Sequence, residues 1–140
     1  CLYSKICKMS RFELFLKYPL FKGMSMDGLF PLLTKVSLDF DNYTAGDLIF
    51  NKDIVCENLV FLLDGKVELE NEQKEKRIAE GPELIVFTRL FGQKRNMPLT
   101  VKAVDNCSIM QIDRKSLLFL MRNSQTVLCN YLDLISDMIV

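Results

Sequence analysis

The chain has 140 residues, a length that suits one domain with a buried core. Its 18 Lys and Arg balance its 18 Asp and Glu, so it lacks the basic excess that free-standing nucleic-acid binders use against phosphates. It contains no histidine, which removes Ser-His-Asp and Cys-His catalysis and the His-rich zinc sites. We therefore predict that the chain is not an enzyme and has no catalytic residues, metal ligands or cofactor.

Five cysteines are present, and no two of them have the C-x-x-C spacing of a metal or redox pair. The odd number and the lack of an export signal favour free thiols and a cytoplasmic location. Cys56, Cys107 and Cys129 are predicted to be buried as small hydrophobic residues. For Cys1 and Cys7 a redox role is left open. Since no apolar run is long enough to span a bilayer, no membrane partner is expected.

Residues 1–37 are predicted to be helical. Pro19 should end or kink a first helix, whose apolar face consists of Phe12, Phe15, Leu16 and Leu20. Ser25 is expected to cap a second helix, in which Pro31 would be tolerated in the first turn. The buried stripe of this second helix is predicted to be Leu29, Leu32, Leu33 and Val36.

Residues 38–113 are predicted to form short strands. Alternation begins in "VSLDFDNY", with Leu38 and Phe40 on one face, and "TAGD" is typical of a turn. "NLVFLLDGKVELE" indicates a hairpin that turns at Asp64-Gly65, and "NEQKEKR" indicates a solvated hairpin tip. "LTVKAV" and "CSIMQID" are two further strands. Many short strands bracketed by helices favour a β-sandwich or roll over a parallel sheet.

Residues 114–140 return to helix, with Ser124 as the expected N-cap of the last one. This helix carries an apolar stripe that is wider than one narrow seam requires. We expect it to pair with a second copy and also to pack partly onto its own roll. The stripe consists of Leu128, Tyr131, Leu132, Ile135, Met138 and Ile139.

Four segments in order resemble the cyclic-nucleotide-binding domain of Crp/Fnr (catabolite activator) transcription regulators. They are "PLFKGMSMDGLFPLL", "YTAGDLIF", "LVFLLDGKVEL" and "PLTVKAVDNCSIMQIDR". The resemblance implies a mainly β fold, an antiparallel jelly roll (double-stranded β-helix) with N-terminal helices and a C-terminal dimerisation helix. It also implies a sensor role in a cytoplasmic homodimer.

The resemblance further implies that residues 1–140 form a single domain. N-terminal helices would occupy 1–37, the roll 38–113 and C-terminal helices 114–140, the last of them truncated. A helix-turn-helix domain is expected beyond residue 140, and only that domain would contact DNA.

The resemblance breaks at the phosphate site. In the family, F-G-E-x-A-L and a later Arg hold the nucleotide, with the Glu on the ribose and the Arg on the phosphate. Counting back from Thr100, Met97 stands at the Arg position, while Val86 and Phe87 stand at the Gly and Glu positions. The predicted pocket positions of this degenerate cassette are Val86, Phe87, Thr88, Arg89, Leu90, Met97, Pro98 and Leu99.

Binding of cAMP in the family's way is therefore not expected. Three alternatives stay open at this point. The pocket could hold an unknown, more apolar effector, or it could be filled by Phe87, Met97 and their neighbours in a dimerisation or interaction domain. Alternatively, Arg89, Lys94 and Arg95 could bind a different anion. A regulatory domain of a kinase or channel is also consistent with the sequence.

Overall fold

The computed structural model describes residues 15–52, 54–88, 90 and 96–139, with side chains described as far as residue 137. Cys1, Cys7 and Phe12 lie outside the described residues. The chain divides into two compact units, each of which we describe by itself. One comprises residues 38–114, and the other combines residues 1–37 with 115–140.

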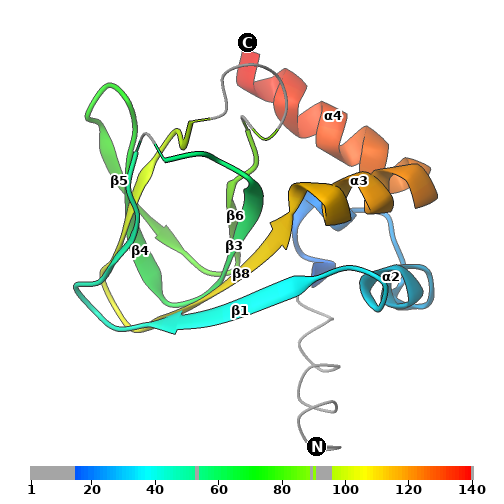
Figure 1. Ribbon diagram of the computed structural model, residues 1–140, viewed down its shortest axis with the longest axis horizontal. Helices are drawn as coiled ribbons and strands as arrows, with labels where there is room; N and C mark the ends of the chain where they lie inside the picture. Colours follow the sequence, from blue (N-terminus) through cyan, green and yellow to red (C-terminus); the bar gives the residue numbers. More distant parts are fainter. Residues whose placement is uncertain (1–14, 53, 89, 91–95, 140) are drawn as a thin grey trace, which may run out of the picture. The chain divides into compact units, whose positions relative to one another are not determined.

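The unit of residues 38–114 contains two antiparallel sheets, and Figure 1 shows them facing each other. Their strand orders are β1-β8-β3-β6 and β2-β7-β4-β5, which is the pairing of a jelly roll. The predicted fold class is thereby confirmed. The strands are β1 (Leu38–Tyr43), β2 (Leu48–Phe50), β3 (Asn58–Asp64), β4 (Lys66–Glu70), β5 (Lys76–Glu80), β6 (Glu83–Val86), β7 (Thr100–Ala103) and β8 (Cys107–Asp113).

The hairpin predicted at Asp64-Gly65 is wrong. Strand β3 pairs with β6 and β8, whereas β4 pairs with β5 and β7, so Gly65 carries the chain from one sheet to the other. The burial pattern shows why. Five consecutive residues of β3 are buried, as in a strand covered on both faces, while β4 alternates between buried and partly exposed residues. The chain thus turns a corner of the roll at Gly65.

A hairpin does join β4 and β5, and its tip is the polar segment that the sequence predicted. Asn71 organises this tip, since its backbone N–H donates to the carbonyl of Glu75 (3.0 Å). The Asn71 side-chain oxygen accepts from the N–H groups of Gln73 and Glu75 at 3.0 and 2.9 Å. These local bonds replace strand pairing at the tip.

The predicted turn at "TAGD" is also present. The carboxylate of Asp47 accepts from the backbone N–H and the hydroxyl of Thr44 at 2.9 and 3.0 Å. Gly46 has a φ of +94°, a conformation in which an L side chain is strained. The turn therefore fixes the start of strand β2, which begins directly after Asp47.

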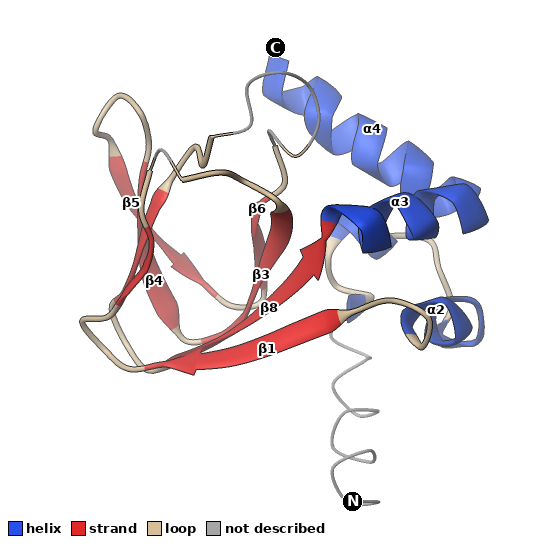
Figure 2. Ribbon diagram, in the orientation of Figure 1, coloured by secondary structure: helices blue, strands red, loops and turns tan. Residues whose placement is uncertain are grey.

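The second unit is helical (Figure 2), with the 3-10 helix η1 (Pro19–Phe21) and the helices α2 (Met26–Leu33), α3 (Arg114–Asn123) and α4 (Gln125–Ile139). Both predicted N-caps are confirmed, because Ser25 accepts from the N–H of Gly28 and Ser124 from that of Val127, each at 3.2 Å. Pro31 lies in the second turn of α2 and not in the first. Since Pro lacks an N–H, Pro31 cannot donate a backbone hydrogen bond within α2, which ends at Leu33.

Helix α4 is tied to η1 by one side chain. Asn130 donates from its Nδ2 atom to the carbonyls of Leu20 (2.9 Å) and Lys22 (2.8 Å). On the same side of α4, Val127 and Tyr131 are buried. Cys129 is exposed, so its predicted burial is wrong. It lies two residues from Val127, which places it across the helix from the buried side.

Candidate functional site

The candidate site is the segment between β6 and β7, residues 87–99, which we call the cassette loop. Its first part follows the buried end of β6, where Val86 pairs with Val60 of β3. Its last part leads through Asn96 and Met97 into β7. Arg89, Lys94 and Arg95, the basic residues considered for anion binding, lie outside the described residues.

Three of the predicted pocket positions are buried. Val86, Leu90 and Met97 have exposed fractions of 1%, 0% and 3%. Phe87, Thr88, Pro98 and Leu99 are half-buried. Val86 and Met97, the residues predicted to stand at the family's Gly and Arg positions, are therefore part of the core. Such positions offer no charge and no polar group to an anionic ligand.

The cassette loop is bonded to the segment between β2 and β3. The backbone N–H of Met97 donates to the carbonyl of Ile54 at 2.7 Å, and Asn96 forms an antiparallel bridge with Val55. The thiol of Cys56 lies 3.6 Å from the carbonyl oxygen of Thr88. The sequence does not indicate these partners, because Ile54 and Val55 carry no alternation or motif that would assign them to the site.

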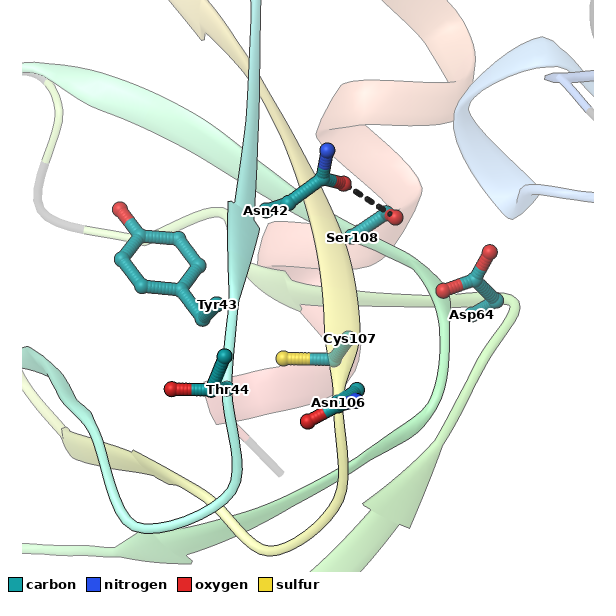
Figure 3. A pocket seen from close by; sticks show the side chains of 7 residues that line it. All are labelled: Asn42, Tyr43, Thr44, Asp64, Asn106, Cys107 and Ser108. Atoms are coloured by element: carbon teal, nitrogen blue, oxygen red, sulfur yellow. Dashed lines mark hydrogen bonds between the residues drawn. The ribbon is translucent and has the colours of Figure 1, made fainter.

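Away from the cassette loop, a hollow of about 260 Å³ lies at the ends of β1, β3 and β8 (Figure 3). Most of its lining residues have polar side chains, among them Asn42, whose side-chain oxygen accepts from the Ser108 hydroxyl at 2.7 Å. The full lining is Asn42, Tyr43, Thr44, Asp64, Asn106, Cys107 and Ser108. No sequence motif pointed to it, although polar residues end each of these strands.

Cys107 in this hollow is not activated for chemistry. Burial raises the pKa of its thiol, and the carboxylates of Asp64 and Asp47 raise that pKa further. The thiol therefore stays protonated at neutral pH, and a protonated thiol is a poor nucleophile and metal ligand. Among the described residues, no three Cys, Asp or Glu side chains gather closely enough to hold a metal ion.

The predicted dimer stripe divides between two environments. Leu128 and Leu132 are 37% and 53% exposed, whereas Tyr131 is 4% exposed and Ile135 is half-buried. The side chains of Met138 and Ile139 lie outside the described part of α4. Leu128 and Leu132 are one helical turn apart, so they leave a short apolar patch on the surface.

The family model of the cyclic nucleotide-binding domain matches residues 40–124, which is more than half of the chain. The chain belongs to this family. The match spans the whole cassette loop, so its apolar residues lie inside a cyclic nucleotide-binding domain. A search of the curated proteins finds no significant match to the sequence.

Solved structures share the fold of this cyclic nucleotide-binding domain. The sensor domain of the transcriptional regulator DNR from Pseudomonas aeruginosa has a TM-score of 0.74 at 20% identity, covering 90% of this chain and 91% of that one. The catabolite activator protein of Thermus thermophilus has a TM-score of 0.72 at 21% identity and covers 86% of this chain. This chain spans only 58% of that protein's length.

A channel domain has the same fold. The C-linker and CNBHD of zELK channels, crystallized in the presence of cAMP, has a TM-score of 0.69 at 18% identity and covers 96% of this chain and 69% of that one. Within the described part of the chain, no helix has both the length and the apolar character needed to cross a membrane.

Proposed function

We propose that this chain is the regulatory sensor domain of a Crp/Fnr-type transcription regulator whose cassette does not take cyclic nucleotides in the family's way. One observation carries this proposal: Met97, at the position where the family has its phosphate-binding Arg, is 3% exposed. A buried thioether supplies neither charge nor a hydrogen-bond donor to a phosphate. The domain would act by binding and by conformational change, without catalysis.

The missing groups matter because a cyclic phosphate must leave water to enter the roll. A guanidinium fork offsets that desolvation with charge and two hydrogen bonds. In this chain Phe87 also replaces the Glu that accepts from the ribose, and Pro98 has no backbone N–H to donate. The phosphate and the sugar would thus both lose their partners.

A second candidate function is a dimerisation or interaction domain with a filled interior. The burial of Val86, Leu90 and Met97 favours it, because these three side chains pack within the protein itself. In that case the domain would respond to a partner protein or to its second copy and not to an effector. If the domain is a sensor instead, the proposed ligand is an effector that is more apolar than a cyclic nucleotide.

The proposed partner is a second copy of the chain, paired through α4. The exposed leucines Leu128 and Leu132 support this pairing, since a helix–helix seam is built from such residues. DNA would be contacted only by another domain of the regulator, in the cytoplasm. The likeness to the zELK channel domain keeps a channel or kinase regulator as the competing assignment.

Calorimetric titration of the 140-residue chain with cAMP and with cGMP tests the proposal. We expect no binding heat from either nucleotide. The double variant Met97→Arg/Phe87→Glu restores the two missing groups and is expected to gain cAMP binding. Met97→Leu is the matched control, because it keeps the apolar character and the volume of the side chain. We expect this variant to bind neither cAMP nor cGMP. Micromolar affinity of the unaltered chain for either nucleotide would refute the proposal.

A further inference from the structure

The hollow at the ends of β1, β3 and β8 is built by neighbouring strands of one sheet (Figure 3). Across β8, Ser108 lies in register between Asn42 of β1 and Asp64 of β3. The next pair along β1 and β8 is Tyr43 and Cys107. All five of these residues line the hollow. Strand pairing therefore fixes where their side chains start.

Two turns hold the rim of the hollow. The side-chain oxygen of Asn106 accepts from the backbone N–H of Ala45 at 3.1 Å, which ties the turn before β8 to the turn after β1. Thr44, which also lines the hollow, donates its backbone N–H and its hydroxyl to the carboxylate of Asp47. These bonds within the protein hold the lining in place, so binding would require little further ordering of side chains.

The charges around the hollow have one sign. After burial, the carboxylates of Asp64 and Asp47 raise the pKa of the Cys107 thiol, and Asp41 and Asp47 likewise raise the pKa of Tyr43. Among the described residues, no Lys or Arg forms an ion pair with any of these three aspartates. A hollow lined by charge of one sign attracts the opposite charge, which here is a cation.

Two polar groups of the lining are left without a partner. In the part of the chain that the structure describes, neither the carboxylate of Asp64 nor the thiol of Cys107 makes a hydrogen bond. Cys107 is only 3% exposed, so water reaches almost none of it. Buried polar groups without a partner are uncommon in folded proteins. Both groups are thus free to bond to a molecule in the hollow.

The volume of the hollow limits what it can hold. At about 260 Å³ it lies just below the range of about 300–1,000 Å³ that is typical of small-molecule sites. It therefore suits a single head group better than a whole nucleotide. Since the described residues offer no group of three metal-ligating side chains, the cation that fits must bring its own hydrogen-bond donors.

We propose that the hollow binds the head group of an organic cation, a guanidinium in preference to an ammonium. A guanidinium is planar and carries several N–H donors, which suit acceptors that lie apart from one another. These acceptors are the carboxylate of Asp64 and the side-chain oxygens of Asn42 and Asn106, each of which has a lone pair to spare. A free molecule and an arginine side chain of a partner protein both offer this head group. The site is independent of the cassette loop and of the proposed function.

Amide NMR titration of the 140-residue chain tests the site. The probes are propylguanidinium and the peptide acetyl-Gly-Arg-Gly-amide, which carry the same charge, and acetyl-Gly-Gln-Gly-amide is the neutral control. We expect both cations to shift the amide resonances of Asn106, Cys107 and Ser108 saturably, with a Kd on the order of 1 mM, and the control to shift none of them. Binding of the arginine peptide about tenfold tighter than propylguanidinium supports a partner's arginine, and equal affinity supports a free cation.

Asp64→Asn removes the charge of the lining and keeps the shape of the side chain. Asp105→Asn is the matched control, because Asp105 is an exposed aspartate of the turn before β8 that does not line the hollow. We expect Asp64→Asn to weaken binding of propylguanidinium about tenfold and Asp105→Asn to change it less than about twofold. Equal weakening in the two variants would overturn the site, since it would show unspecific attraction by surface charge.

The absence of a saturable shift, or equal shifts with the glutamine control, would also overturn the site. If Asp64→Asn does not fold, the salt dependence of the unaltered chain takes its place. Raising NaCl from about 20 mM to about 500 mM screens the aspartates and should weaken binding of propylguanidinium at least about threefold. An affinity that does not change with salt would overturn the role of charge in the hollow.

Discussion

Val86 and Met97 are the two residues on which the proposed loss of cyclic-nucleotide binding rests. Both are nearly inaccessible, at 1% and 3% exposure. We propose that they stand where the family uses a turn glycine and a guanidinium. In that register each replacement would add apolar volume to the interior, and Met97 would remove a contact to an anion.

Tyr43 and Cys107 are expected to lower the free energy of unfolding of the chain at alkaline pH. Burial raises the pKa of both groups, and Asp41 adds to the effect for Tyr43 as Asp64 does for Cys107. A raised pKa means that the folded state keeps a proton that the unfolded state loses. The stabilisation is complete below the ordinary values of 9.0 for Cys and 10.0 for Tyr, and it is lost as pH rises through the higher folded values.

Urea unfolding between neutral pH and about pH 11 measures this effect. The unaltered chain should lose stability progressively at the alkaline end. Tyr43→Phe and Cys107→Ala each remove one of the titrating groups, so each variant should show a shallower decline. An identical pH dependence in the unaltered chain and both variants would show that these groups do not contribute.

At the scale of elements, the corners of the roll depend on glycine. Gly65 has a φ of +88°, and a Cβ placed there would lie 2.6 Å from the Cβ of Cys107 and would also meet the carbonyl oxygen of Asn106. Gly46 has a similar φ of +94°, but nothing lies within 4 Å of its added Cβ. The two positions therefore separate backbone strain from steric overlap.

We expect Gly46→Ala to lower the free energy of unfolding by about 1 kcal/mol, the cost of the backbone conformation alone. Gly65→Ala should lower it by about 3 kcal/mol or more, because the overlap at the corner adds to that cost. Chemical denaturation of the two variants measures the difference. Equal losses would show that the corner relaxes around the added methyl group.

The helices and strands were largely predictable from the sequence, but the pairing of the strands was not. Alternation and turn residues placed most strands, and Ser25 and Ser124 marked two helix starts because N-caps are local features. A single glycine step between strands looks the same in a hairpin and in a corner, so the pairing of β3 was assigned wrongly. Burial on both faces of β3 decides it.

The candidate site was also predictable only in part, because local motifs can be found in the sequence and long-range contacts cannot. Motif spacing located Met97 in the cassette loop, but its bond to Ile54 joins residues far apart in the sequence. No local pattern encodes such a contact. Cys129 shows that residue type alone does not predict burial. This small apolar residue is exposed because it lies two residues from the buried Val127 and so faces the other side of α4.

At the scale of the whole molecule, the exposed patch on α4 predicts association. Leu132→Glu places a charge in the proposed seam, whereas Asp137→Lys changes a charge at a helical position well away from Leu128 and Leu132. In sedimentation experiments we expect the unaltered chain and Asp137→Lys to be dimers and Leu132→Glu to be a monomer. A monomeric unaltered chain at micromolar concentration would contradict the pairing.

The proposed function requires that the cassette loop does not respond to a cyclic nucleotide. The methyl group of Met97 is a suitable reporter, because we propose that Met97 stands at the position of the phosphate-binding Arg and its side chain is buried in the loop. Methyl NMR of the chain labelled at methionine, with and without millimolar cAMP, is the decisive measurement. We expect the Met97 methyl resonance to stay in place, and a saturable shift of that resonance would contradict the proposed function.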